Sequence, residues 1–434
     1  MKISLFQGIL FGVFGLGALI GLFVFATYSG NNNGGDNVGK VVIWGTLPKD
    51  GVQMALTNSA QNEVLLKNVS YVQKDSSTLP NDLATAIATG SSPDLILTSQ
   101  EELLSLSKFI TRIPPSTLPA STFTNAFIAG SEVFSSSAGY YGIPFLVDPL
   151  VLFSNRSILS SEGIAKPPST WESMVGLVPN VAILTSSRQI TRGLIALGTY
   201  DNVHNARGIL SALFIQTGIT ISSYSSSGIF SYDLGGDNVS RGASLGEAVI
   251  GFYTQFADPS KVSYTWNASM SDSQQEFLTG DLALYIGFAS EARFFKSANP
   301  NLDFIVSPIP QPATSKVNST YGLIYAFMIP TGSKNPSGAY QSAALLTNSP
   351  EQIASASATG LAPVTLNELT NVPNDSVSSV AYAGALYSKG WMSPAPRNTD
   401  IVFSGMIGDV INGRSTLSSA LASAERSLSA LLQK

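Results

Sequence analysis

The sequence predicts an α/β protein with two lobes, preceded by one N-terminal transmembrane helix. Three observations predict this arrangement: strands and helices alternate after residue 40, three extended apolar segments lie far apart in the chain, and the N-terminus carries a long apolar run. With 434 residues, the chain is also too long for one ordinary hydrophobic core.

The apolar N-terminal run, Leu10 to Tyr28, is long enough to span a bilayer, which requires about 20 residues of helix. It contains no charged side chain, and Lys2 precedes it, which predicts that the folded part is exported. We interpret residues 1–30 as a membrane anchor, although the small residue Ala26 leaves a cleaved signal segment open. Residues 31–39 are polar and glycine-rich, as in a flexible linker.

The folded part opens with the pattern of a parallel sheet. A buried strand is predicted at Val41–Trp44, a helix at Asn81–Thr89 and another strand at Pro93–Leu97. Ligands of such sheets bind beyond the carboxyl ends of the strands. We therefore expect a cleft lined by the residues at these strand ends, namely Trp44, Gly45, Thr46, Ser99 and Gln100. Trp44 could instead be a core residue.

The stretch Tyr140–Asn155 predicts the first crossing between the lobes. It contains two short apolar strands separated by Asp148 and Pro149. Proline lacks the N–H that a central strand needs, so we expect the strand to change partners there. A lone carboxylate in so apolar a run must be paired, hydrogen-bonded or open to water. Our hypothesis is that Asp148 faces the cleft between the lobes.

Two later segments have the same character: a strand at Leu282–Ile286 followed by Gly287 and Phe288, and a strand at Tyr321–Pro330. Three crossings are what a two-lobed protein needs if each lobe is built from separated pieces of chain. We place the crossings near 147–150, 286–288 and 325–329. This division assigns 40–147 and 288–325 to lobe I, and 150–286 and 329–434 to lobe II.

Helices are predicted between and after these crossings. Arg192–Leu197 and Ala206–Phe214 have helical character, and a capping box from Ser169 to Glu172 predicts another helix start. His204 is interpreted as a capping or core histidine rather than a catalytic one. The chain is predicted to end in two helices, at about 399–411 and 417–432.

The composition excludes several functions. There is no cysteine, so disulfides, thiolate metal sites and cysteine nucleophiles are excluded, and a single histidine leaves little for other metal sites. A net charge of −5 without any basic cluster argues against nucleic-acid binding. The nucleophile-elbow, zinc-protease, phosphate-loop and dinucleotide motifs do not occur. We therefore expect a binding protein without metal or cofactor, not an enzyme.

Four motifs resemble those of one protein family. Tyr140–Pro144 with Leu152–Asn155, Pro167–Glu172, Phe277–Gly287, and Asn299–Phe304 with Pro308–Pro310 occur in the order and spacing of that family's motifs. They are similar to the extracellular solute-binding proteins of ABC importers, family 1, of the maltose-binding type. The resemblance implies a type II periplasmic-binding-protein fold, with each lobe a mixed sheet flanked by helices, that closes around its solute by hinge motion.

The resemblance also implies binding residues. Asp148 falls where maltose-type proteins have a glutamate that hydrogen-bonds the sugar, and Lys49 falls near their lysine after the first strand, although Pro48 replaces an expected acid. Their stacking aromatic after the second crossing falls near Phe288, beside Gly287, whereas Val402 aligns with their stacking tryptophan. These departures weaken the case for a maltodextrin and leave other carbohydrates open.

Aromatic side chains could stack on apolar sugar faces, and polar ones could bind sugar hydroxyls. The candidates for stacking, with core packing as the alternative for each, are Trp44, Trp266, Phe288, Tyr325 and Trp391. The candidates for hydrogen bonding are Thr46, Ser99, Gln100 and Asp148.

We therefore expect a monomeric receptor held at the cell membrane on its extracytoplasmic side, which hands a small solute, in the first place a carbohydrate, to ABC permease subunits. Two alternatives remain open. The same fold could bind a peptide, a polyamine or another solute, or act as a sensor, and the protein could be an exported glycan-active enzyme. Low charge in the predicted cleft loops argues against a highly charged ligand.

Overall fold

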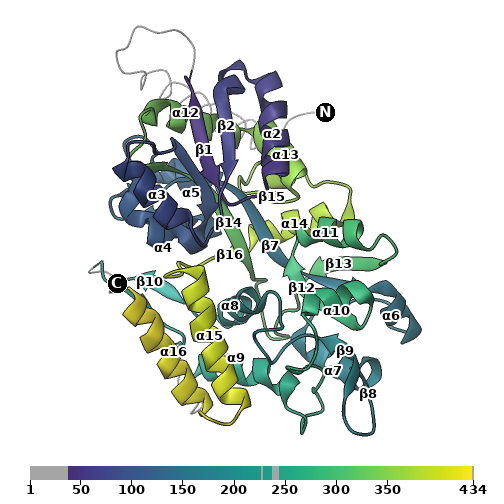
Figure 1. Cartoon of the computed structure of the whole chain (residues 1–434). Helices are drawn as coiled ribbons and strands as arrows, with labels where there is room; N and C mark the ends of the chain where they lie inside the picture. The colour runs from purple at the N-terminus through teal and green to yellow at the C-terminus, as the bar shows by residue number, and fades with distance from the viewer. Residues whose placement is uncertain (1–37, 226–227, 237–243, 433–434) are drawn as a thin grey trace, which may run out of the picture.

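The computed structural model describes residues 38–225, 228–236 and 244–432. These residues form two lobes joined by two long strands that run through both of them (Figure 1). The predicted anchor at residues 1–30, and the predicted linker apart from Val38 and Gly39, lie outside the described residues. Within the described part of the chain, no helix is both long and apolar enough to cross a membrane.

Lobe I is built on three parallel strands in the order β2–β1–β3, as the strand–helix alternation predicts. The carboxyl ends of these strands point toward lobe II (Figure 1). Its strands are β1 (Val41–Gly45), β2 (Val69–Gln73), β3 (Leu95–Ser99) and β4 (Ile110–Thr111), with a small hairpin of β5 (Ser135–Ser136) and β6 (Gly139–Tyr140). Its helices are α2 (Lys49–Asn62), α3 (Leu79–Ala88), α4 (Leu103–Leu106) and α5 (Ala120–Ala126), with the 3₁₀ helices η1 (Val64–Asn68), η2 (Gln100–Glu102), η3 (Ser107–Phe109) and η4 (Ala129–Phe134).

The two long strands are β7 (Ile143–Asn155) and β14 (Thr320–Pro330). Every residue of β7 is buried, which explains why its sequence is mostly apolar rather than alternating. β7 pairs with β14 as far as Pro149, and from Leu150 onward it pairs with β12 (Leu282–Phe288) instead. The predicted change of partner at the proline is therefore confirmed.

Lobe II contains β8 (Ile183–Leu184), β9 (Ile190–Ile195), β12, β13 (Phe304–Pro308) and a hairpin of β10 (Ser222–Tyr224) and β11 (Phe230–Tyr232). Its helices are α6 (Arg156–Ser161), α7 (Trp171–Val181), α8 (Ala206–Gln216), α9 (Leu245–Thr254), η5 (Gln255–Ala257), α10 (Ser273–Thr279) and α11 (Glu291–Ala298). The helix predicted at Arg192–Leu197 is wrong, because Gly193 and Ile195 pair with β12 in a parallel ladder. A short buried apolar run fits either structure, and the neighbouring strand decides between them. The capping box of α7 lies at Thr170 and Ser173, one residue after the predicted start.

The remaining elements show that the chain enters lobe I along β14 and later returns to lobe II. Helices α12 (Pro336–Thr347) and α13 (Ser349–Thr359) pack on β1 and α2 of lobe I (Figure 1). Four connecting elements then run back beside the two long strands, where β15 pairs with β7 and β16 pairs with β14. These elements are β15 (Ala362–Pro363), η6 (Glu368–Thr370), α14 (Ser376–Leu386) and β16 (Ser388–Lys389). Finally, α15 (Pro396–Ile411) and α16 (Leu417–Leu431) pack on α9 in lobe II.

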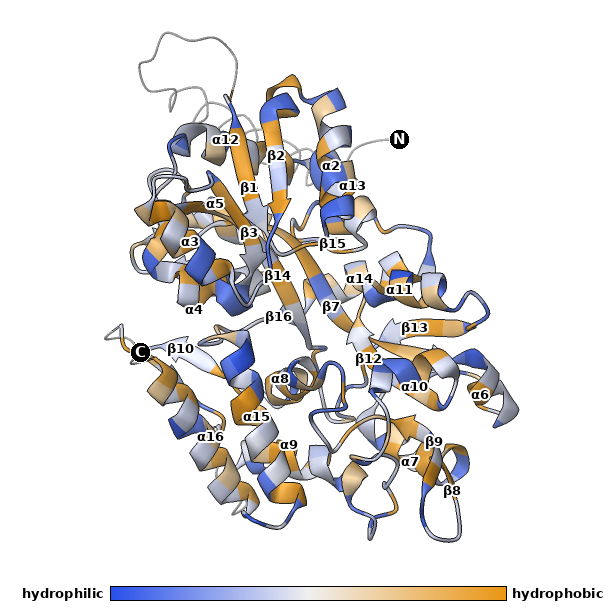
Figure 2. Cartoon of the chain, in the orientation of Figure 1, coloured by the Kyte–Doolittle hydropathy of each residue, from blue (hydrophilic) through white to orange (hydrophobic). Residues whose placement is uncertain are grey.

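The expected assignment of 288–325 to lobe I and of 329–434 to lobe II is therefore wrong for several segments. β12 and β13 both pair with the second half of β7, so the chain stays in lobe II until β14. The core follows the central sheet, where β1, β3, β7 and β14 are mostly hydrophobic, while hydrophilic residues lie on the outer faces of the helices (Figure 2).

Candidate functional site

A cleft between the lobes holds two cavities. The first, of about 420 Å³, lies at the start of α8, and we call it the α8 cavity. The second, of about 350 Å³, lies at the ends of β1 and β3, and we call it the β3 cavity. Glu101 and Leu323 line both, so the two cavities adjoin there.

The β3 cavity is formed by residues that follow parallel strands, as the sheet rule predicts. The side chain of Thr46 follows β1, and its hydroxyl lies 3.0 Å from the hydroxyl of Thr98 in β3. Ser99 ends β3 and is followed at once by the buried turn η2. The full lining is Thr46, Gln73, Lys74, Asp75, Ser76, Ser99, Glu101, Glu102, Leu323 and Tyr325.

Glu102 is a buried carboxyl of this cavity with a raised pKa. Its carboxylate accepts hydrogen bonds from the Thr98 hydroxyl (3.0 Å) and the Ser99 hydroxyl (2.9 Å). Burial, and secondarily the negative charge of Glu101, raise the pKa of Glu102 from 4.5 to about 7, although the two hydroxyls oppose the rise. The carboxyl can therefore serve as hydrogen-bond donor or acceptor near neutral pH.

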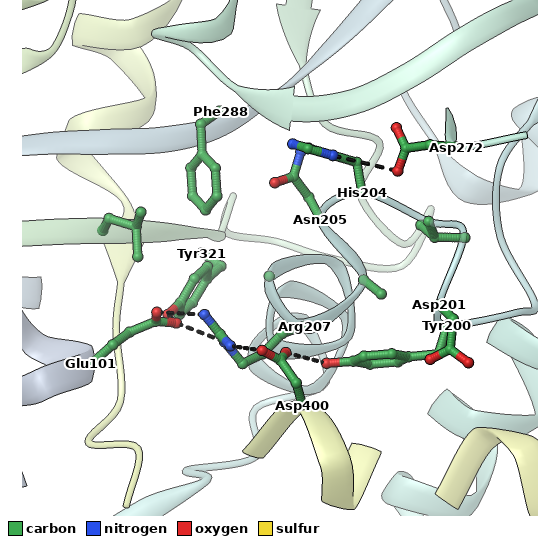
Figure 3. A pocket seen from close by; sticks show the side chains of 14 residues that line it. Glu101, Tyr200, Asp201, His204, Asn205, Arg207, Asp272, Phe288, Tyr321 and Asp400 are labelled. Atoms are coloured by element: carbon green, nitrogen blue, oxygen red, sulfur yellow. Dashed lines mark hydrogen bonds and ion pairs between the residues drawn. The ribbon is translucent and has the colours of Figure 1, made fainter. Parts of the chain in front are cut away.

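The α8 cavity is centred on Arg207, which projects from the first turn of α8 (Figure 3). Its guanidinium donates to both carboxylate oxygens of Glu101, from Nε at 3.0 Å and from Nη2 at 2.7 Å. Its Nη1 donates to Asp400 Oδ2 at 2.6 Å, and the Tyr200 hydroxyl donates to the other oxygen of Asp400, also at 2.6 Å. The Tyr321 hydroxyl donates to Glu101.

The charges of this network shift the pKa values of its members. Burial lowers the pKa of Arg207, but the carboxylates of Glu101 and Asp400 outweigh it and leave the pKa raised. Burial, then the negative charge of the neighbouring carboxylate, raises the pKa of Tyr321 and of Tyr200. Arg207 therefore stays charged and the two phenols stay protonated donors at any physiological pH.

The outer wall of the α8 cavity is more open. His204 Nδ1 lies 3.5 Å from Asp272, and the two side chains are 43% and 44% exposed. The interpretation of His204 as a capping or core histidine is therefore wrong, because Asn205 occupies the N-cap position of α8 and His204 lines the cavity beside it (Figure 3). The full lining is Glu101, Tyr200, Asp201, Val203, His204, Asn205, Ala206, Arg207, Gly208, Asp272, Phe288, Tyr321, Leu323 and Asp400.

Four of the sequence-predicted site residues line the cavities. Thr46, Ser99 and Tyr325 line the β3 cavity, and Phe288 lines the α8 cavity. Phe288 and Tyr325 are half-buried, so each presents part of its ring to a cavity. Lys49 is exposed at the start of α2, and its backbone N–H donates to Gln73, a residue of the β3 cavity.

Three other predicted residues lie behind the cavity walls and line neither cavity. Trp44 lies under Lys74, whose ammonium is 4.0 Å from the centre of the indole ring. Gly45 is buried against the Leu97 carbonyl, where a Cβ would lie at 2.6 Å. Gln100 is fully buried, and its side-chain amide bonds to Gly322 (3.1 Å) and Ile324 (2.7 Å) of β14, so it joins η2 to that strand rather than facing a cavity.

Two predicted aromatics are corrected to core residues. Trp266 is 0% exposed, and its indole N–H donates to Asn202 at 3.2 Å. Trp391 is 3% exposed, donates to Ser211 at 2.9 Å and stacks on Phe403. Both indole N–H groups are satisfied inside lobe II, which leaves neither ring a face for a ligand.

Asp148 and Gly287 lie at the seam between the lobes without lining either cavity. Asp148 is opposite Leu323 in the ladder and so shares the cleft-facing side of the sheet, yet it is 4% exposed. It accepts a hydrogen bond from the Ser290 backbone N–H at 3.1 Å and takes part in none of the ion pairs found among the described residues. Burial raises its pKa to about 7, partly offset by Ser290. Gly287 is packed against Tyr285, where a Cβ would lie at 2.4 Å. Asp148 therefore lies at the seam between the lobes, covered by the start of α11, and the hypothesis that it binds the solute there stays a prediction.

Sequence reasoning missed the charged centre of the cleft. Glu101 and Glu102 follow β3 directly, so the rule that found Ser99 and Gln100 would have found them one and two residues later. Arg207 is a charged residue in a helix whose other residues are almost all buried, which is a second usable signal. The expectation of low charge in the cleft is also wrong: six carboxylates line the cavities against the two permanent cations Lys74 and Arg207, namely Asp75, Glu101, Glu102, Asp201, Asp272 and Asp400.

The chemistry of the cavity linings is suited to binding a small solute. Across the described ranges, no group of three or more histidine and acidic side chains could hold a metal ion. The cavities combine hydroxyls, carboxylates, a guanidinium and four aromatic side chains, which together match a small polar solute with apolar faces.

Comparison with known proteins decides the family. A sequence model described as a bacterial extracellular solute-binding protein matches residues 59–382, which is well over half of the chain. The chain belongs to that family. Membership places the folded part outside the cytoplasm and among binding proteins rather than enzymes. A search of curated proteins finds no match.

Solved structures support the fold of this solute-binding protein. A cyclo/maltodextrin-binding protein in complex with maltotetraose is 15% identical, with a TM-score of 0.70 over 93% of this chain and 99% of that chain. A cyclic alpha-maltosyl-1,6-maltose binding protein from Arthrobacter globiformis is 14% identical, with a TM-score of 0.73 over 92% and 100%. A protein solved with mannobiose bound is 18% identical, with a TM-score of 0.66 over 89% and 99%. At these identities the likeness establishes the two-lobe fold alone.

Proposed function

We propose that this protein is an extracytoplasmic receptor that captures a carbohydrate between its two lobes and delivers it to an ABC importer. The observation that carries the proposal is the cleft, in which two adjoining polar cavities each have part of an aromatic ring on the wall. A sugar site needs both polar groups and aromatic rings, because sugar hydroxyls require hydrogen-bond partners and sugar ring faces stack on aromatics. The similar structures named above hold maltotetraose and mannobiose.

The proposed binding residues are those that reach the cavities. Thr46, Ser99 and Glu102 would bind hydroxyls in the β3 cavity, beside the ring of Tyr325. In the adjoining α8 cavity, the ring of Phe288 would stack on the solute. Hinge motion about β7 and β14 would close the lobes, and the closed form would then dock on permease subunits. The receptor would act as a monomer, held at the membrane by its N-terminal segment.

Calorimetric titration of the exported part with maltooligosaccharides, mannooligosaccharides and monosaccharides tests the proposal. We expect one panel member to bind with 1:1 stoichiometry, and analysis of the recovered sugar to find it intact. Cleaved sugar would instead support the glycan-active enzyme, and absence of binding by every sugar would contradict the carbohydrate assignment. Fractionation of cells that express the full chain tests the anchor, because a tethered receptor stays with the membranes and is released by detergent but not by salt.

One observation favours a second candidate, a solute that carries protonated amines, such as a polyamine or an amino sugar. The cavities are lined by six carboxylates and two permanent cations, so the cleft has an excess of negative charge. Such a site would attract cationic solutes and repel anionic ones. Spermidine and glucosamine oligomers therefore belong in the same titration, and a response to spermidine without a response to neutral sugars would select this candidate.

A further inference from the structure

Arg207 joins the two lobes across the middle of the cleft. It belongs to α8 of lobe II, whereas its carboxylate partner Glu101 belongs to η2 of lobe I (Figure 3). The two hydrogen bonds, at 3.0 Å and 2.7 Å, engage both oxygens of the carboxylate. A bidentate contact of this kind fixes orientation as well as distance, which a single contact from a lysine would not do.

Each partner of the ion pair is also positioned by hydrogen bonds to other neighbouring side chains. On the lobe II side, Asp400 holds the guanidinium at 2.6 Å, and the Tyr200 hydroxyl holds Asp400. On the other side, Glu101 is 5% exposed and accepts a hydrogen bond from Tyr321 of the long strand β14. Ordering these side chains in advance lowers the entropy lost when the pair forms, so the contact is stronger than an exposed ion pair.

Opening of the lobes would separate these partners unequally. Arg207 would keep Asp400, because both residues lie in lobe II. Glu101 would keep only the neutral Tyr321 as a partner, next to the carboxyl of Glu102, and that carboxyl repels it. Separation therefore leaves a carboxylate without a cation beside a second acid, and this cost favours the joined arrangement.

Other contacts between the lobes are hydrogen bonds rather than ion pairs. The guanidinium of Arg293, in α11 of lobe II, donates to the carbonyls of Ala358 (2.6 Å) and Ser357 in α13 of lobe I. At one end, the Tyr224 hydroxyl of the β10–β11 hairpin bonds with Tyr141 of lobe I, which also accepts from Arg112 at 2.9 Å. This is a contact between two phenols, of which Tyr224 is 42% exposed. Among the ion pairs of the described residues, only Arg207–Glu101 spans the cleft.

We propose that the Glu101–Arg207 ion pair is an interlobe latch that sets the solute affinity of the cleft by stabilising the closed arrangement of the lobes. The part that concerns affinity rests on the proposed function, whereas the part that concerns closure does not. Arg207 acts here as a positioning residue: it holds the lobe I wall against the lobe II wall. Because apparent affinity scales with the fraction of molecules in the binding-competent state, loss of the latch weakens binding even of a solute that touches neither residue.

The absence of cysteine from the chain allows a direct measurement of closure. One spin label at Asn81→Cys on α3 and one at Ser423→Cys on α16 would report the distance between the lobes, since both positions are exposed. We would record the distance distribution by electron double resonance, first without solute, in the parent and in Glu101→Gln, Arg207→Gln and the double variant. The matched control is Asp409→Asn, which breaks an exposed ion pair with Arg414 inside lobe II.

We expect both single variants to shift the distribution to longer distances, and the double variant to shift it no further than the larger single effect. Arg207→Lys keeps the charge but loses the bidentate contact, so its interlobe distance should lie between those of the parent and Arg207→Gln. This variant keeps the test informative if Arg207→Gln fails to fold. Asp409→Asn should match the parent. Solute affinity should fall about 10-fold in the latch variants.

An unchanged distance distribution in both Glu101→Gln and Arg207→Gln would overturn the latch. A fall in affinity without a change in distance would overturn it as well, because the two residues would then act by touching the solute. A shift in distance in a protein that binds no sugar would support the latch while contradicting the proposed carbohydrate function, so the two failures can be told apart.

Discussion

The two walls of the cleft hold similar polar groups in different ways. On the lobe I wall, Glu101 and Glu102 are each 5% exposed and are fixed by hydrogen bonds from residues of the central strands. On the lobe II wall, His204 and Asp272 are 43% and 44% exposed and lie 3.5 Å apart at the mouth of the α8 cavity. The difference follows from the elements, because strand ends carry lobe I groups inward whereas a loop and helix start leave lobe II groups at the surface.

Burial decides what such groups contribute. A buried carboxylate interacts through a medium of low effective dielectric constant, so its partners and its protonation state matter greatly. An exposed pair is screened by water and salt and adds little to stability. We therefore expect lobe I acids to control stability and its pH dependence, and exposed lobe II groups to have small effects. Arg207, which is 19% exposed and joined to Glu101, is the exception on the lobe II side.

The largest expected effect comes from Arg207→Ala. This change leaves Glu101 buried without a cation, which should lower the free energy of unfolding by about 3 kcal/mol at pH 7. The matched change on the exposed part of the same wall, His204→Ala, should cost less than about 1 kcal/mol. Urea denaturation of both variants measures the difference. Equal losses of unfolding free energy in the two variants would show that burial does not set the energetic difference between the two walls.

Glu102→Gln tests the pH dependence of the lobe I wall. The pKa of Glu102 is raised from 4.5 to about 7, so the folded protein binds this proton more tightly than the unfolded chain does. The free energy of unfolding should therefore fall as the pH rises from 4.5 to 7 and stay level above that, by on the order of 3 kcal/mol in total. Glutamine cannot ionise, so the variant should be the more stable protein at pH 8 and should lose that advantage near pH 4.

Thermal unfolding from pH 4 to pH 8 measures this effect, with Glu132→Gln as the control for an exposed acid of lobe I. Asp148 also has a pKa raised to about 7, so the parent profile contains both contributions, and subtraction of the Glu102→Gln profile isolates that of Glu102. A variant that follows the parent at every pH would contradict the buried, perturbed state of this carboxyl.

The sequence allowed correct prediction of features that depend on neighbouring residues. Pro149 marks the change of strand partner because a missing N–H affects any ladder, and Thr46 and Ser99 reach a cavity because they lie at the carboxyl ends of parallel strands. The family resemblance is confirmed as well, because the model of a solute-binding family matches residues 59–382.

Features that depend on distant residues could not be predicted. Glu101 and Arg207 are 106 positions apart, and nothing local to either residue indicates that they meet. Trp266 and Trp391 were candidates because tryptophan stacks on sugars, but tryptophan also fills cores, and only the positions of Asn202 and Ser211 decide between the two. The strand β9 was predicted as a helix for the same reason, since its pairing with β12 is invisible in a short apolar run.

Two of the aromatic rings that line the cavities extend the comparison to binding. Tyr325 lies in the β3 cavity and Phe288 in the α8 cavity, so Tyr325→Ala and Phe288→Ala separate the contributions of the cavities. If the solute spans both, each change should weaken binding by about 1–2 kcal/mol, measured by calorimetry with the sugar that the parent binds. Phe294→Ala, which removes an exposed ring of α11, is the control and should bind as the parent does.

An effect of only one of the two changes would assign the solute to one cavity. No effect of either change would contradict the proposal that these rings stack on a sugar. Because both rings are half-buried, the thermal stability of each variant should be recorded alongside its affinity, and a loss of binding counts only where the variant remains folded at the temperature of the titration.

The smallest expected effect comes from Lys74→Gln, at the outer edge of the lobe I wall. Lys74 lies over Trp44 at 4.0 Å from the ring centre and pairs with Asp82 at 3.0 Å. Its side chain is 24% exposed and that of Asp82 is 38% exposed, so water screens the pair, and we expect a stability loss of less than about 1 kcal/mol. Added salt should shrink even this difference, which denaturation at low and high ionic strength would show. A loss above about 2 kcal/mol that salt leaves unchanged would mean that exposure does not set the energy of charged contacts here, and that Lys74 belongs with Glu101 and Glu102 in the rigid part of the wall.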